Sequence, residues 1–267
     1  MNNGSEEHVC GGAEQYRHAL SGTRVLLTGA AGGIGSALSR YLSVAGCNIA
    51  AVSRSADKLE ALSRRASGDR ASGDPASEEG GRFEKIVADL SRSGVPRECV
   101  EQAAHVLGGL DVLINNAGVA VSAPIEETSL TEWDRQLHLN ATVPFLLSQA
   151  AIPWLEQSLR ATVVNMGSVV SHKGYVGQVG YVASKHALYG MTKVLARELH
   201  PRGVRVHFLA PGGVATDMIH GIRPDIKWNE LIQPEDVADA VLFLLTRRGN
   251  AVIDEIAIRR AGSEPWR

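Results

Sequence analysis

Cysteine is scarce in this chain of 267 residues, which holds three thiols, Cys10, Cys47 and Cys99. Their number is odd, and their wide spacing matches none of the paired motifs that bind zinc. The sequence therefore argues against a disulfide framework and against a structural zinc site. We expect free thiols in a reducing compartment, with the cytoplasm as the default location.

Long apolar runs and charge of one sign are also lacking. No segment reaches the roughly 18 consecutive apolar residues of a membrane span, and no apolar run near the N-terminus resembles a secretion signal. Lys and Arg number 27 against 29 Asp and Glu, so no long-range field attracts a nucleic acid backbone. We expect neither a membrane nor a nucleic acid as a partner.

The chain is instead rich in hydrophobic residues, at 44%, and in glycine, with 28 residues. Short runs of Val, Ile and Leu recur along it and are apolar throughout, which indicates strands buried on both faces, as in a parallel sheet. These runs predict seven strands, at Val25–Thr28, Ile49–Val52, Ile86–Ala88, Val112–Asn115, Thr162–Asn165, Val204–Leu209 and Ile253–Ile258.

Helical patterns separate the predicted strands. One opens with the capping-box residues Ser129 and Glu132, and another has Pro234 in its first turn. Alternating strands and helices predict a doubly wound α/β fold with a seven-stranded, mostly parallel sheet and helices on both faces.

One domain is expected over residues 21–267, because single α/β units of this size are common. Residues 1–20 are polar and without periodicity, so we expect a flexible N-terminal extension. Residues 66–82 repeat Ala-Ser-Gly-Asp, at 66–69 and 71–74, and end near a glycine pair. This composition predicts a mobile loop insert.

A glycine-rich turn, Thr28–Gly35, joins the first predicted strand to a helical pattern. Glycines allow a close backbone approach, and a helix that begins here offers N–H groups and its positive dipole end to phosphates. Tight packing of strand against helix would also explain the glycines. Their spacing, Thr-Gly-x-x-x-Gly-Ile-Gly, resembles that of the short-chain dehydrogenases/reductases, which implies a three-layer Rossmann fold and a nicotinamide dinucleotide.

The resemblance also implies cofactor contacts at the strand ends. Ser53 and Arg54 stand where an acid would bind a free ribose 2′-hydroxyl, and Arg54 could bind a 2′-phosphate, so NADP(H) is favoured over NAD. Asp89 matches the position near the adenine, although it could equally cap a turn. The implied contacts are Gly29, Gly32, Gly33, Ile34, Gly35, Ser53, Arg54, Asp89, Leu90, Asn116, Ala117, Gly118, Tyr181, Lys185, Pro211, Gly212, Val214 and Thr216.

Tyr181 and Lys185 stand four residues apart, on one face if the segment is helical. A unit charge about 4 Å away could lower the pKa of a phenol by about one to three units, so we expect Tyr181 to be acidified for proton transfer. Ser168 ends the fifth predicted strand at the ligand-binding edge of the sheet. By resemblance, Ser168 binds the substrate oxygen, Tyr181 passes the proton and Lys185 also binds the nicotinamide ribose. Asn140 matches the family's proton-relay asparagine, although alone it would be read as a buried helix amide.

Together these features imply an oxidoreductase that moves a hydride between NADP(H) and a carbonyl or secondary alcohol, as a carbonyl or 3-oxoacyl-type reductase. An NAD-dependent alcohol or polyol dehydrogenase and a non-catalytic NADP-binding sensor are the alternatives. Residues 253–259 replace the glycine-rich ending of acyl-carrier-protein reductases, which counts against an acyl-carrier substrate. The family also implies a homotetramer or homodimer joined through the helices that hold Asn140 and Tyr181.

The chain departs from the family pattern at Gly167, often a serine, and at His207, often an asparagine. Residues 217–233 are few for a substrate-covering lid, so we expect an open pocket, and residues 173–180 are expected to contact the substrate. His172 and His186 have no acid or cysteine cluster around them in sequence, so no metal ion is expected.

Overall fold

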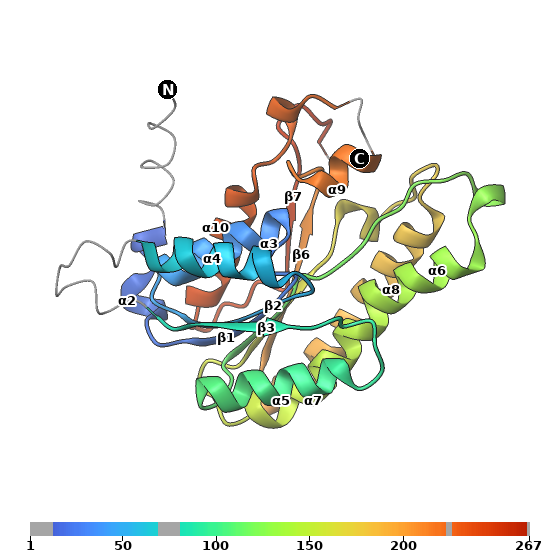
Figure 1. Ribbon diagram of the computed structural model, residues 1–267. Coiled ribbons are helices and arrows are strands. Elements are labelled where there is room, and N and C mark those ends of the chain that lie inside the picture. The colour runs from blue at the N-terminus through green and yellow to red at the C-terminus, as the bar shows by residue number, and fades with distance from the viewer. Residues whose placement is uncertain (1–12, 69–80, 223–225, 266–267) are drawn as a thin grey trace.

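A single parallel sheet forms the centre of the computed structural model, which describes residues 13–68, 81–222 and 226–265 (Figure 1). Within these residues seven strands lie in the order β3-β2-β1-β4-β5-β6-β7, and every neighbouring pair is parallel. The predicted doubly wound sheet is confirmed, and it is parallel throughout. The strands are β1 (Arg24–Thr28), β2 (Asn48–Ser53), β3 (Phe83–Val87), β4 (Val112–Asn115), β5 (Thr162–Met166), β6 (Arg205–Pro211) and β7 (Glu255–Ile258).

Helices cover both faces of the sheet, which gives three layers (Figure 1). One face carries α3 (Gly33–Val44), α4 (Ala56–Gly68) and α10 (Pro234–Thr246). The other carries α5 (Val95–Leu107), α7 (Val143–Leu155) and α8 (Val179–Leu199). The shorter helices are α2 (Arg17–Leu20), η3 (Ile125–Glu127), α6 (Leu130–Leu137), η4 (His138–Thr142), η5 (Val169–Ser171), η6 (His200–Arg202), α9 (Asp217–Ile222) and η7 (Trp228–Glu230).

Strands β1, β2, β4, β5 and β6 each supply buried side chains to both faces of the sheet, which explains their unbroken apolar runs. In β1, Val25 and Leu27 pack toward α3 and α10, whereas Leu26 packs toward α5 and α7. All three are fully buried. Burial of each such side chain stabilises the fold by roughly 1.5–3 kcal/mol.

The N-terminal segment is more ordered than the sequence predicts. α2 lies within the predicted flexible extension, and Ala13 and Leu20 are buried in the core beside α3 and α10. The prediction is therefore wrong for residues 13–20, while residues 1–12 lie outside the described residues. A helix this short offers too few apolar positions for periodicity to reveal it.

The predicted loop insert is shorter than 66–82. Helix α4 continues to Gly68, and Arg82 N donates to Asn48 Oδ1 at 2.8 Å, which ties the chain to β2 before β3 begins. A Cβ at Gly81 would lie 1.8 Å from Cys47 O, so the backbone is closely packed there. The rest of the predicted insert, residues 69–80, lies outside the described residues.

Predicted element ends are correct in some places and shifted in others. Helix α10 starts at Pro234 as predicted, and Ser129 Oγ accepts a hydrogen bond from Glu132 N at the start of α6. The Glu132 carboxylate pairs with Arg135 instead, so half of the capping box forms. Strand β3 begins three residues before the predicted Ile86, and β7 begins at Glu255.

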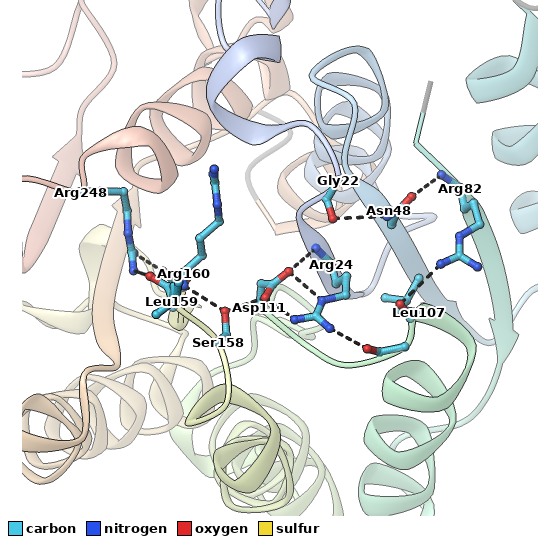
Figure 2. A network of polar contacts seen from close by, with 12 residues as sticks. Gly22, Arg24, Asn48, Arg82, Leu107, Asp111, Ser158, Leu159, Arg160 and Arg248 are labelled. Carbon is cyan, nitrogen blue, oxygen red and sulfur yellow. Dashed lines mark hydrogen bonds and ion pairs between the residues drawn. The ribbon is translucent and has the colours of Figure 1, made fainter. Parts of the chain in front are cut away.

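A polar network fastens the amino ends of the strands, opposite the edge where ligands bind in such sheets (Figure 2). Asp111 accepts hydrogen bonds from Arg24 N, Nε and Nη2 at 2.8, 2.9 and 2.7 Å, and from Ser158 Oγ at 2.6 Å. Burial acts to raise the pKa of Asp111, but these hydrogen bonds outweigh it and the pKa is lowered. Asp111 therefore stays ionised and joins β1 to the segment that precedes β5.

Two further expectations concern membranes and thiols. Among the described helices, none is long and apolar enough to cross a membrane. Cys47 and Cys99 are free, as predicted. Both are also buried, and burial raises the pKa of their thiols to about 12 and about 11. Cys10 lies outside the described residues.

Candidate functional site

A cleft of about 1460 Å³ opens at the carboxyl ends of the strands. Parallel strands end there together, and the loops that follow β1 to β6 converge on it. All residues predicted to contact the cofactor line this one cleft, namely Gly29, Gly32, Gly33, Ile34, Gly35, Ser53, Arg54, Asp89, Leu90, Asn116, Ala117, Gly118, Tyr181, Lys185, Pro211, Gly212, Val214 and Thr216.

The glycines of the first turn are required by close contacts. Gly29 has a left-handed φ of +64°, and a Cβ there would lie 2.8 Å from Ala117 Cα. A Cβ at Gly35 would lie 2.0 Å from Gly29 O, and one at Gly33 would lie 2.3 Å from Thr216 Cγ2. Tight packing and a phosphate cradle are therefore compatible at this turn rather than alternatives.

The first turn of α3 faces the cleft and fits a dinucleotide. Gly32 is its N-cap, no side chain caps the helix, and Gly33, Ile34 and Gly35 line the cavity. Amide N–H groups at a helix N-terminus attract anions, and a glycine turn leaves room for a pyrophosphate beside them. The residues present can therefore hold the diphosphate of a nicotinamide dinucleotide.

The end of β2 provides the second part of this site. Arg54 is exposed at the rim of the cleft, and Ser53 Oγ accepts a hydrogen bond from Ser55 N at 3.3 Å. Lys58, one turn into α4, lines the same rim and has no motif that marks it in the sequence. Two cations and no acid at the end of β2 suit a phosphate better than a free hydroxyl.

Asp89 combines both roles that its sequence allowed. Its Oδ1 accepts hydrogen bonds from Ser91 N and Ser91 Oγ at 3.1 and 2.7 Å, so it caps the turn after β3, and it also lines the cleft. The hydrogen bonds from Ser91, together with the charges of Arg54 and Arg92, lower the pKa of Asp89. Asp89 therefore presents a carboxylate to the cleft at neutral pH.

Thr28, the first residue of the glycine-rich motif, organises the loop after β4. Its Oγ1 accepts hydrogen bonds from Asn116 N at 3.0 Å and Ala117 N at 3.1 Å. Asn116 Nδ2 donates in turn to the carbonyls of Thr28 and Gly29. Asn115 Nδ2 donates to Asn165 Oδ1 at 2.8 Å, which connects β4 to β5.

Ser168 and Tyr181 lie together in the cleft and share a side-chain hydrogen bond. Ser168 follows β5, is nearly buried, and accepts a hydrogen bond on Oγ from Val170 N. Burial raises the pKa of Tyr181, and a hydrogen bond between the Ser168 and Tyr181 side chains lowers it only in part. The two oxygens thus face one position in the cleft, where a substrate oxygen could bind.

Lys185 lies close to Tyr181, but it does not acidify the phenol as predicted. Its Nζ lies 5.8 Å from the centroid of the Tyr181 ring and donates to Met166 O at 2.8 Å. Burial lowers the pKa of Lys185 to about 8, and burial also dominates the pKa of Tyr181, which is raised. The predicted lowering of the Tyr181 pKa is wrong for the protein as described, because desolvation raises that pKa and the hydrogen bond with Ser168 offsets only part of the rise.

Asn140 is fully buried in the π-helical turn η4, and its side chain does not line the cleft. Its Nδ2 donates to Val119 O at 2.8 Å and to Ser184 Oγ at 2.9 Å, and its Oδ1 accepts from Val119 N at 2.8 Å. These hydrogen bonds use both the amide nitrogen and the amide oxygen of Asn140. The structure therefore gives this side chain a positioning role between the loop after β4 and helix α8.

Gly167 adjoins Ser168, lines the cleft, and meets an aromatic ring. A Cβ at Gly167 would lie 2.0 Å from Phe208 Cζ. Phe208 on β6 is buried and packs against Tyr189 with ring centroids 4.8 Å apart. The departure from the family's common serine is therefore matched by a bulky neighbour.

The far wall of the cleft is formed by α9 and by residues that follow β7. Met218, Ile219 and Ile222 of α9 line it together with Ile226, so the described part of this segment gives the cleft an apolar wall. Residues 223–225 lie outside the described residues. Arg259 and Arg260, after β7, line the cleft too, and no sequence motif marked them.

The histidines near the site have protein partners. His172 Nε2 pairs with Glu255 Oε1 at 2.6 Å, and Tyr189 OH donates to Glu255 Oε2 at 2.8 Å. His186 Nδ1 lies 2.9 Å from Val182 O. In the described part of the chain, no group of three or more His, Cys, Asp or Glu residues is placed to hold a metal ion.

Comparisons with known proteins agree with this architecture. A family model described as short chain dehydrogenase matches residues 23–227. The chain is 31% identical, over 245 residues, to a 3-oxoacyl-acyl-carrier-protein reductase of Aquifex aeolicus, covering 89% of this chain and 95% of the relative. It is 35% identical, over 234 residues, to the D-threitol dehydrogenase of Mycolicibacterium smegmatis, covering 84% and 86%.

Solved structures are similar over most of their length. A metagenomic short-chain oxidoreductase in complex with NADP has a TM-score of 0.77 and 31% identity, with 91% of this chain and 99% of that chain covered. A short chain dehydrogenase from Burkholderia cenocepacia, also in complex with NADP, has a TM-score of 0.77 and 31% identity, with 91% and 97% covered.

Proposed function

The chain belongs to the short-chain dehydrogenase family, and from this we propose that it is an NADP(H)-dependent oxidoreductase that interconverts a carbonyl group and a secondary alcohol. The single observation that carries the proposal is the hydrogen-bonded pair of Ser168 and Tyr181 in a cleft lined by a glycine cradle. A bound nicotinamide supplies the hydride for reduction and accepts it in oxidation.

The side chains of the cleft handle the substrate oxygen and its proton. In reduction, Ser168 donates a hydrogen bond to the carbonyl oxygen, and Tyr181 OH transfers its proton to that oxygen as the alcohol forms. The raised pKa of Tyr181 keeps the phenol protonated at neutral pH and thus able to act as the acid. Lys185 Nζ returns a proton toward Tyr181 and binds the ribose, and Asn140 positions α8 through Ser184.

Preference for NADP(H) is supported by the end of β2. Arg54 and Lys58 line the rim there, and Ser53 stands at the position where an NAD-preferring site would have an acid. The similar structures from a metagenome and from Burkholderia cenocepacia contain NADP. Both observations favour the 2′-phosphorylated dinucleotide.

A carbonyl panel with NADPH tests the proposal. We expect loss of the reduced-nicotinamide absorbance with small ketones, and a fall of at least about 1000-fold in kcat for Tyr181→Phe, in which the acid is missing. Binding of NADPH, followed by nicotinamide fluorescence, should persist in Tyr181→Phe.

Full activity of Tyr181→Phe would refute the mechanism. Saturable NADPH binding without turnover of any member of the panel would favour a cofactor-binding sensor instead.

A further inference from the structure

Gln178 is a polar side chain of the cleft that the proposed reaction leaves unused. It is the N-cap residue of α8, three positions before Tyr181, and is only 7% exposed. Its side chain does not cap the helix, and within the described residues its amide makes no hydrogen bond to another side chain or to the backbone. Because Gln178 lines the cleft, its amide is available to donate to and accept from a bound ligand.

The backbone around Gln178 is held from both sides. Gln178 N donates to Tyr175 O at 3.3 Å, and Gln178 O accepts from Val182 N at 2.8 Å. The preceding Gly177 has φ +74°, and its carbonyl accepts from Ala123 N at 2.8 Å. The amide is therefore presented to the cleft by a fixed turn, and little ordering is needed when a ligand binds.

We propose that the Gln178 amide binds a second oxygen of the substrate, on the carbon next to the reacting carbonyl. Three residues of helix rise about 4.5 Å, so Gln178 and Tyr181 meet neighbouring atoms of a ligand rather than its two ends. The inference rests on the proposed function and names its substrate class: α-hydroxy ketones in reduction and vicinal diols in oxidation.

The chemistry of a primary amide selects a hydroxyl group. The amide donates and accepts, as a hydroxyl does, and it carries no charge to balance a carboxylate. Arg259 is not free for an acid, since its Nη1 donates to the carbonyls of Arg260, Ala261 and Ser263. Arg260 lies beside Gly213, on the β6 side of the cleft. A hydroxyl neighbour of the carbonyl therefore fits this position better than the carboxylate of a 2-oxo acid.

A matched pair of ketones tests the subsite. With NADPH, kcat/KM is measured for 1-hydroxybutan-2-one and butan-2-one in the wild type, in Gln178→Met, and in the control Gln157→Met, whose glutamine is exposed after α7. We expect the wild type to prefer the hydroxy ketone. Gln178→Met should lower kcat/KM for the hydroxy ketone about 10- to 100-fold and for butan-2-one less than about threefold. The control should change neither.

Equal losses on both ketones, or a wild-type preference for 2-oxobutanoate, would overturn the proposal. If the wild type reduces no carbonyl at all, the proposed function fails, and the subsite is then judged by calorimetric binding of butane-1,2-diol to the protein with NADP. Weaker binding by Gln178→Met than by the wild type supports the subsite, and equal binding overturns it.

Discussion

Lys185 places an ammonium group in a buried position, and the desolvation of that charge destabilises the fold. Burial lowers its pKa from 10.5 to about 8, so the folded state holds the proton less tightly than the unfolded chain does. A depressed lysine pKa means that stability rises with pH between these two values and is lowest below pH 8. The difference corresponds to roughly 3 kcal/mol at pH 7.

We therefore expect Lys185→Met to be more stable than the wild type at pH 7, by about 1–3 kcal/mol, because the buried charge is gone. The gain should shrink toward pH 10. Urea unfolding at pH 7 and near pH 10 measures the gain in stability and its decrease with pH, with the exposed Lys227→Met as a control. A less stable variant at pH 7 would show that the hydrogen bond to Met166 O outweighs the desolvation of the ammonium.

Arg54 is expected to set the choice of dinucleotide. A charge-assisted hydrogen bond to a phosphate contributes about 1.5–3 kcal/mol, so Arg54→Ala should lower the ratio of kcat/KM for NADPH over NADH by at least about tenfold. Arg64→Ala, on the exposed side of α4, serves as the matched control. If the ratio does not move toward NADH, another group binds the phosphate, with Lys58 the first to examine.

At this scale, sequence patterns located the lining residues of the cleft but not their protonation. The motifs at the strand ends all reached one cavity, because parallel strands present their carboxyl ends together. The predicted direction of the Tyr181 pKa shift was wrong, because desolvation depends on how deeply neighbouring elements cover a residue. Asn140 was expected in a helix and lies in a helical turn. Its partners Val119 and Ser184 lie on other segments, so the local sequence could not predict them.

Among the elements, the amino ends of the strands depend on Asp111 (Figure 2). We expect Asp111→Asn to lower the free energy of unfolding by about 2–4 kcal/mol at pH 7, because Arg24 would lose its carboxylate partner. The lowered pKa of Asp111 means that its contribution is present above its ordinary value near 3.8 and is lost as the pH falls further. Urea unfolding should therefore show the two proteins converging below pH 4.

The exposed Asp134→Asn, in the middle of α6, is the control for this change and should leave the free energy of unfolding near that of the wild type. Activity of Asp111→Asn should stay near that of the wild type, since the cleft lies at the opposite edge of the sheet. A variant that loses activity without losing stability would contradict this separation of roles.

Strands and capped helices were predictable because their signals are local. Continuous apolar runs marked the strands, and Pro234 marked the start of α10. Helix α2 escaped prediction because Ala13 and Leu20 are held by the tertiary core rather than by a periodic pattern. Strand β3 began early at Phe83 because pairing with β2 extends it into charged residues.

For the whole molecule, the cleft is assembled from segments far apart in the chain. The first turn after β1 meets Thr216 after β6, and residues after β7 complete the wall. Motifs could indicate the order of these segments along the sheet. They could not reveal Arg259 or Arg260, whose place in the cleft depends on the path of the chain after the last strand.

Assembly of several copies stays a prediction, and exposed apolar residues on the helices involved allow a test. Phe145 on α7 is 47% exposed and Val194 on α8 is 56% exposed. If a homodimer or homotetramer forms through the helices near Asn140 and Tyr181, Phe145→Asp with Val194→Asp should shift sedimentation toward the monomer. Leu159→Asp, at a fully exposed position outside these helices, should leave the assembly intact.

The contact between Gly167 and Phe208 limits how this sequence can diverge from its relatives. Serine at 167 would bring its Cβ within 2.0 Å of the ring, so the two sites can only change in concert. Gly167→Ser alone should lower the melting temperature, and Phe208→Ala should lower it less in the Gly167→Ser background than in the wild type. Such epistasis constrains the order in which these mutations can accumulate. A smaller side chain at position 208 must come before a serine at position 167.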